Sequence, residues 1–137
     1  MKDALGLPVH NPNTSAVTWL EGGRRAGMTT AMVDIAIMNA RAGAKVQYWS
    51  RTWSEADSAA NVCYHRLQVT DAAPADSKFF QPGGVKTLLF PNGGRVEFRG
   101  LDGTFAGEQE RPGIDFSLYD ANGTGKVVRH HADVRHR

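Results

Sequence analysis

The chain has 137 residues, a net charge of +2, 41% apolar residues and 22% charged residues, a composition typical of one globular domain. So small a net charge does not by itself indicate a nucleic-acid-binding protein, and a single cysteine excludes an internal disulfide and favours a reducing compartment. No stretch approaches the ~20 apolar residues of a membrane span, and no apolar leader is present, so we expect a cytoplasmic protein outside the membrane.

The first half of the chain alternates between strand and helix patterns. The long apolar helix pattern is stopped by Gly43, and its apolar residues surround the axis, so we expect it to pack on more than one side. Ser54 is expected to cap the second helix. The predicted elements are an irregular arm over 1–15, strands over 16–20 and 45–50, and helices over 29–42 and from 54 to about 68. This alternation indicates an α/β fold.

The second half is richer in turn residues. Pro91-Asn92-Gly93-Gly94 lies between two apolar runs and predicts a β-hairpin. The predicted elements are a connection over 70–84, hairpin strands over 85–90 and 95–100, a surface loop over 101–113, a strand over 114–120, and a basic, His-rich tail over 123–137. We therefore expect one α/β domain over 16–122, between the arm and the tail.

A glycine-rich turn joins the first predicted strand to the first helix. Gly22, Gly27 and Thr29 have the spacing of the phosphate-binding G-x-x-x-x-G-K-[ST] loop, but Met28 occupies the lysine position. In such a loop backbone N–H groups and a helix N-terminus hold phosphate, and the hydroxyl binds Mg²⁺. Arg24 and Arg25 could replace part of the missing charge. The alternative is a plain strand-to-helix turn with two solvated arginines. The nucleotide-binding candidates are Gly22, Gly23, Gly27, Met28, Thr29 and Thr30.

Asp120 ends an apolar strand pattern downstream of this turn. An acid in that position of a phosphate-binding domain reaches the Mg²⁺ that bridges the nucleotide phosphates. The alternative is an ordinary strand-end acid that begins a turn with Asn122-Gly123. The two motifs occur in the order and on the elements that nucleotide binding requires.

These segments together resemble a known family. The loop 23–30, the hairpin 90–100 and the strand 113–121 are similar to the corresponding motifs of phage terminase large subunits, the DNA-packaging ATPases. The resemblance covers roughly 16–122 and implies a truncated, three-layer P-loop NTPase-like α/β domain with a mainly parallel sheet and one β-hairpin. It also implies bound ATP and Mg²⁺, with Thr29 and Asp120 as metal ligands and Arg24, Arg25 and Asp120 as the catalytic residues. The implied partners are double-stranded DNA and other phage packaging or virion proteins, in the host cytoplasm or the phage particle.

Two departures from the family pattern concern hydrolysis. Met28 replaces the lysine, and Ala121 replaces the glutamate that polarises the attacking water. Losing both groups is expected to reduce the rate by a factor on the order of 10³ or more. Two alternatives therefore stand beside an ATPase: a non-catalytic structural or interaction protein derived from a P-loop domain, and a small DNA-binding protein that uses the basic tail. The truncated sheet also predicts self-association through an exposed edge at the P-loop strand.

Other residues have a structural and a functional interpretation. Cys63 is predicted to pack in the core, because no base is associated with it. Trp49 and Trp53 could stack on a base, although core packing is the favoured interpretation. The tail histidines His130 and His131, with His136, are interpreted as solvated rather than as a metal site.

Overall fold

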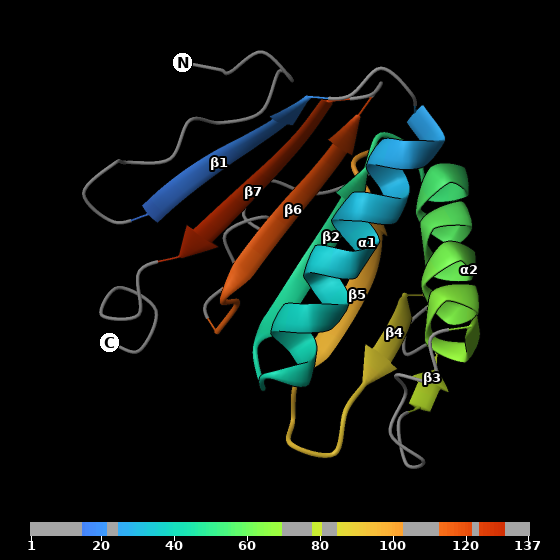
Figure 1. Cartoon of the computed structure of the whole chain (residues 1–137), viewed down its shortest axis with the longest axis vertical. Helices are drawn as coiled ribbons and strands as arrows, with labels where there is room; N and C mark the ends of the chain where they lie inside the picture. Colours follow the sequence, from blue (N-terminus) through green and yellow to red (C-terminus); the bar gives the residue numbers. More distant parts are fainter. Residues whose placement is uncertain are drawn as a thin grey trace.

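The computed structural model describes residues 15–21, 25–69, 78–80, 85–102, 113–121 and 124–130. They form an α/β domain in which two helices pack on a seven-stranded mixed sheet (Figure 1). The elements are β1 (Ser15–Glu21), α1 (Arg25–Arg41), β2 (Lys45–Ser50), α2 (Trp53–Val69), β3 (Lys78–Phe80), β4 (Lys86–Leu89), β5 (Arg95–Gly100), β6 (Phe116–Ala121) and β7 (Thr124–His130). The expected α/β class is confirmed.

The sheet has the order β1-β7-β6-β2-β5-β4-β3. Its centre is parallel, because β2 pairs in parallel with both β6 and β5, whereas the other four of the six pairings are antiparallel. The expectation of a mainly parallel sheet is therefore wrong: strands that follow one another through short connections, such as β4–β5 and β6–β7, pair as antiparallel neighbours. β1 is the terminal strand of this order, as expected for the strand before the glycine-rich turn.

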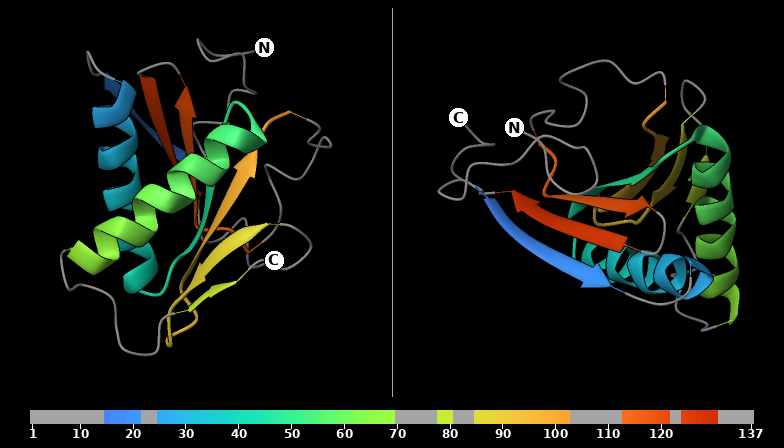
Figure 2. Two further views of the ribbon diagram at one scale, coloured as in Figure 1. Left: turned by 90° about the vertical axis from the view of Figure 1, so that its right-hand side faces the viewer. Right: turned by 90° about the horizontal axis from the view of Figure 1, so that it is seen from above.

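Both helices lie on the same face of the sheet (Figure 2). The buried core contains residues of α1, of α2 and of alternate positions in the central strands, so the described residues form two layers and not the three that were expected. One side of α1 packs on the sheet and another side packs on α2. This explains why the apolar residues of α1 extend around so much of its circumference. At the surface Arg66 donates two hydrogen bonds to Asp34, of 3.0 and 2.8 Å, and these join the two helices.

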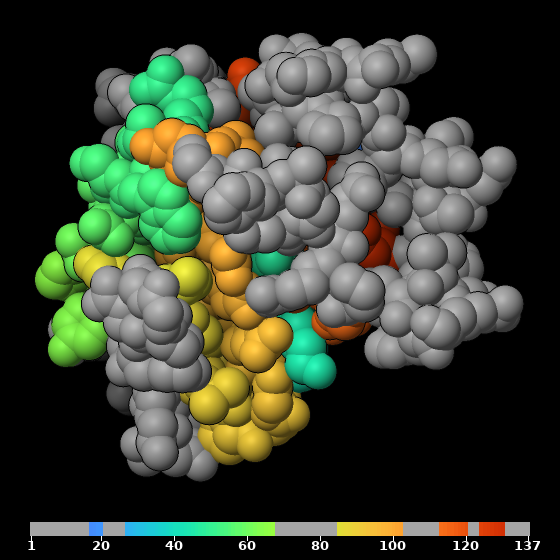
Figure 3. All heavy atoms as spheres, turned by 180° about the vertical axis from the view of Figure 1, so that it is seen from behind, coloured from blue at the N-terminus to red at the C-terminus, as the bar shows by residue number. Residues whose placement is uncertain are grey.

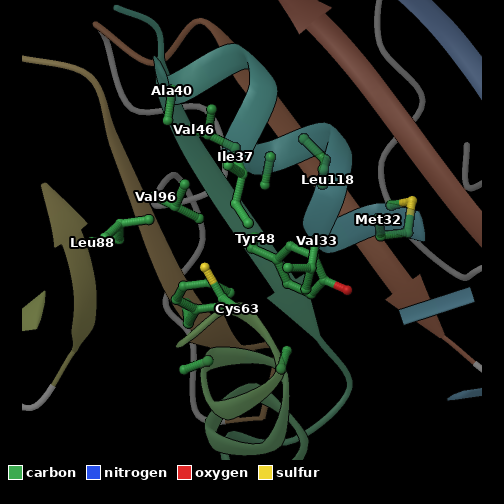
Figure 4. Close-up of a cluster of buried hydrophobic side chains, with 14 of the residues drawn as sticks. Met32, Val33, Ile37, Ala40, Val46, Tyr48, Cys63, Leu88, Val96 and Leu118 are labelled. Atoms are coloured by element: carbon green, nitrogen blue, oxygen red, sulfur yellow. The ribbon is translucent and has the colours of Figure 1, made fainter. Parts of the chain in front are cut away.

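The core follows the alternation of the strands. Val46 and Tyr48 of β2 point toward the helices, and both are fully buried (Figure 4). Cys63 lies in the same cluster, which confirms its predicted packing role. The main contributors from α1 and the neighbouring strands are Met28, Met32, Val33, Ala36, Ile37, Ala40, Leu88, Val96, Phe98 and Leu118.

The opposite face of the sheet carries a row of aromatic and basic side chains across five strands. In register order they are Trp19, Lys126, Tyr119, Trp49 and Arg99. The Lys126 ammonium lies 5.4 Å from the Trp19 ring centroid and 5.5 Å from that of Tyr119, and Trp49 stacks on Tyr119. Trp49 is fully buried, as the core interpretation predicts. Figure 3 views the molecule from this side, with β4 and β5 in yellow and orange.

Local signals account for the ends of several elements. Gly43, at φ +102°, ends α1, and its N–H donates to the Ala40 carbonyl. The β4–β5 hairpin forms as predicted, with the Phe90 N–H bonded to the Gly94 carbonyl at 2.8 Å. Thr52 caps α2 in place of Ser54, because its hydroxyl accepts the Glu55 N–H at 3.1 Å and donates to the Glu55 carboxylate.

Two strands lie where none was expected. β3 falls within the predicted connection 70–84, and β7 falls within residues 123–137, which were expected to form a tail. β7 lies between β1 and β6, so the sheet continues beyond the expected domain end at 122. Lys126, counted as a solvated tail residue, is only 2% exposed because β7 directs it into the aromatic row.

Candidate functional site

The candidate site lies at the edge of the sheet where the parallel strands end. β2, β5 and β6 run in the same direction, and β1 runs with them because two antiparallel pairings separate it from β6. The helices α1 and α2 begin at this same edge, directly after β1 and β2 (Figure 1). Ligands of α/β proteins bind beyond the carboxyl ends of parallel strands, so this is the edge where a site is expected.

Thr29 and Asp120 meet at this edge. The Thr29 hydroxyl donates a hydrogen bond of 2.7 Å to Oδ2 of Asp120, although the two residues are 91 positions apart in the sequence. Thr29 is on the second turn of α1 and Asp120 is near the end of β6, where its side chain is 9% exposed. The two residues predicted as metal ligands therefore lie in direct contact.

Tyr48 is a third member of the site, and no sequence motif indicated it. Its hydroxyl donates a second hydrogen bond, also of 2.7 Å, to the same Oδ2 of Asp120. Burial, followed by the negative charge of Asp120, raises the pKa of the Tyr48 phenol well above its usual value. The phenol therefore remains protonated at neutral pH and acts as a donor. The available sequence signal was a tyrosine in a buried strand, since a buried hydroxyl requires a partner.

Met28 does not line the site. Its side chain is 5% exposed and belongs to the hydrophobic core. A Cβ added to Gly125 of β7 would lie 2.9 Å from the Met28 sulfur and 2.7 Å from that of Met32, so both side chains occupy the space above this glycine. Met28 therefore lies against the sheet rather than in a position equivalent to a phosphate-binding lysine.

Some of the other predicted loop residues belong to α1, and the rest lie outside the described residues. α1 begins at Arg25, four residues before the expected start, so Gly27 lies in its first turn. Thr30 is a partly buried helical residue. Gly22, Gly23 and Arg24 lie outside the described residues, and only the backbone of Arg25 is described. The structure thus brings Thr29 and Asp120 together, and the roles of Arg24 and Arg25 stay predictions.

The donor set fits a hard cation. A hydroxyl and a carboxylate are oxygen ligands of the kind that Mg²⁺ prefers. Within the described residues no group of three or more His, Cys, Asp or Glu side chains could form a metal site of its own. The interpretation of His130 as a solvated tail residue is wrong, because it belongs to β7 and its Nε2 is hydrogen-bonded to the Ser117 hydroxyl at 2.8 Å. His131 and His136 lie outside the described residues.

Comparisons with known proteins add no assignment to this geometry. Neither protein-family models, nor curated proteins, nor solved structures give a match for the chain. Neither of the two helices in the described part of the chain is long and apolar enough to cross a membrane. A functional proposal must therefore be argued from the site itself.

Proposed function

We propose that the chain is a P-loop-type ATP-binding domain, related to the ATPase domain of DNA-packaging terminases, that binds Mg·ATP at the N-terminus of α1. The observation that supports this proposal is the 2.7 Å contact between Thr29 and Asp120. Each residue was predicted from a separate motif, and a hydroxyl beside a carboxylate at this edge is the donor set that a nucleotide-bound Mg²⁺ requires.

The chemistry assigns a separate task to each group. Thr29 and Asp120 would hold Mg²⁺, which neutralises phosphate charge when bound. The first N–H groups of α1 have no acceptor within the helix and favour an anion, and Arg24 and Arg25 would add positive charge. Because Met28 packs in the core and Ala121 ends β6, we expect binding without efficient hydrolysis by this chain alone. Double-stranded DNA and other phage packaging or virion proteins are the partners that the proposal implies.

Calorimetry tests the proposal directly. We expect wild-type protein to bind ATP with micromolar Kd in the presence of Mg²⁺, and Asp120→Asn to weaken this binding at least 10-fold by removing the charge that attracts the cation. Asp57→Asn is the matched control, because Asp57 is an exposed carboxylate on α2, 3.7 Å from Lys86. Combined Arg24→Ala and Arg25→Ala substitution tests the phosphate contacts. Absence of binding at millimolar ATP would refute the proposal.

A second candidate function is a non-catalytic structural or interaction module derived from a P-loop domain. The burial of Met28 against Gly125 favours it, because that contact replaces a phosphate-binding lysine with core packing. This candidate predicts no ATP binding and unchanged thermal stability on addition of Mg·ATP, whereas bound nucleotide stabilises the folded state by mass action. If the chain instead binds DNA through its basic C-terminal residues, Lys126 does not contact the DNA, because its side chain is only 2% exposed.

A further inference from the structure

Tyr48 has a fixed position in the centre of the sheet. It lies in β2, between β5 and β6, and its side chain is fully buried. Its ring packs against Phe98, with the centroids 5.4 Å apart, inside the cluster shown in Figure 4, where its hydroxyl oxygen is red. A ring held on all sides fixes its hydroxyl, so the phenol is a rigid donor.

The strand register directs this donor toward Asp120. Tyr48 is the register partner of Leu118, and Asp120 lies two positions further along β6 on the same face of the sheet. The phenol spans this diagonal and reaches Oδ2 at 2.7 Å. Phenylalanine would fill the core equally well and would bring no buried hydroxyl that needs a partner, so the contact is the distinguishing property of tyrosine here.

The two hydroxyl donors of the site share one acceptor, an oxygen of the Asp120 carboxylate. The Thr29 and Tyr48 hydroxyls donate to Oδ2, and Oδ1 takes part in neither bond. A Mg²⁺ ion would bind a lone pair of the Thr29 oxygen, and the Thr29 proton would still be donated to Asp120. Tyr48 is a second donor to Oδ2 that does not itself bind the cation, so it holds the carboxylate from within the sheet.

We propose that Tyr48 is a positioning residue for Mg²⁺ binding, whose hydroxyl holds Oδ2 of Asp120 and so presents the carboxylate to the cation in one orientation. This inference rests on the proposed function, because it concerns the same Mg·ATP site. It adds a residue from β2 to a site otherwise built from α1 and β6.

The test compares Tyr48→Phe with wild type in two binding measurements. We expect Tyr48→Phe to weaken ATP binding about 10-fold in saturating Mg²⁺ and to leave ATP binding in EDTA unchanged, because the hydroxyl acts through the metal ligand. Tyr64→Phe is the matched control, since Tyr64 lies on α2 and is 46% exposed, and it should change neither value. Urea unfolding of each variant reports stability separately from binding.

The outcomes separate the inference from the proposed function. If wild type binds no ATP with Mg²⁺, the proposed function fails and the positioning role fails with it. If wild type binds and Tyr48→Phe binds equally well, or loses Mg²⁺-dependent and Mg²⁺-independent binding alike, only the positioning role is overturned. Loss of cooperative unfolding in Tyr48→Phe would likewise assign the hydroxyl to the fold rather than to the metal.

Discussion

Met28→Lys introduces the residue that the P-loop motif has at this position, yet the structure predicts that the substitution destabilises the protein. The Met28 side chain is 5% exposed and packs with Met32 above Gly125. A lysine at this position must either bury its ammonium in the core or turn outward and leave a cavity. Its aliphatic stem can refill part of that space, so we expect a loss of about 2–4 kcal/mol in the free energy of unfolding.

Urea denaturation followed by tryptophan fluorescence measures this loss, and a thermal scan should show a Tm lower by on the order of 10 °C. Met38→Lys is the control, because Met38 lies on the same helix, is 64% exposed, and should change the free energy of unfolding by no more than about 0.5 kcal/mol. A Met28→Lys protein as stable as wild type, with tighter ATP binding, would refute the reasoning. It would mean that residue 28 faces the phosphate loop.

Three further predictions concern packing, pH and association. Gly94→Ala should lower the free energy of unfolding by several kcal/mol, because the new Cβ would overlap the Ala40 carbonyl. Gly93→Ala should lower it by only about 1 kcal/mol, because Gly93 has a positive φ but open space around it. Urea denaturation compares the two variants, and equal effects would contradict the reasoning. Burial, and then the negative charge of Asp34, raises the pKa of the Cys63 thiol to about 12. Above a pH of ~8.5 the thiol of the unfolded chain therefore releases a proton that the folded chain retains. Stability should therefore fall by up to ~1.4 kcal/mol per pH unit as pH rises from ~8.5, and Cys63→Ala should reduce that slope in pH-dependent denaturation. Thr18 is exposed on the edge strand β1, and Thr18→Lys should reduce concentration-dependent association in analytical ultracentrifugation. A wild type that stays monomeric at all concentrations would reject edge pairing.

Local chemistry was sufficient to predict the elements whose ends depend on their own residues. Gly43 ends α1 because it adopts a positive φ that most residues avoid, and the turn 91–94 forms its hairpin from its own Asn and Gly residues. The strand 45–50 has the bounds that its alternation predicts. These features require no information about distant parts of the chain.

β7 was missed because its burial depends on other strands. Asn122-Gly123 is a strong hairpin signal, but the basic residues that follow suggested a solvated tail. Lys126 is buried between strands, with the Trp19 ring of β1 and the Tyr119 ring of β6 each close to its ammonium. A pattern of charge along one segment cannot reveal such a site, since the rings come from two other strands.

Two of the three residues of the candidate site could be named from the sequence, and the third could not. Thr29 and Asp120 belong to motifs with defined positions on a helix and a strand, so both could be named as site residues from the sequence, and the structure shows that they are in contact. Tyr48 has no motif, and its contact with Asp120 follows from the parallel pairing of β2 with β6. Strand order is set by the packing of the whole domain, so the third residue became evident only from the folded structure.

Gly125 connects the burial of Met28 to the Thr29–Asp120 contact. It is the register partner of Asp120, and its missing side chain leaves room for the sulfurs of Met28 and Met32. The start of α1 can therefore lie close to the sheet, and Thr29, about 100° further around the helix than Met28, reaches the carboxylate on the neighbouring strand. The packing that removes residue 28 from the loop is the packing that places Thr29 on Asp120. In this arrangement an exposed, phosphate-binding side chain at position 28 and the observed position of α1 exclude each other.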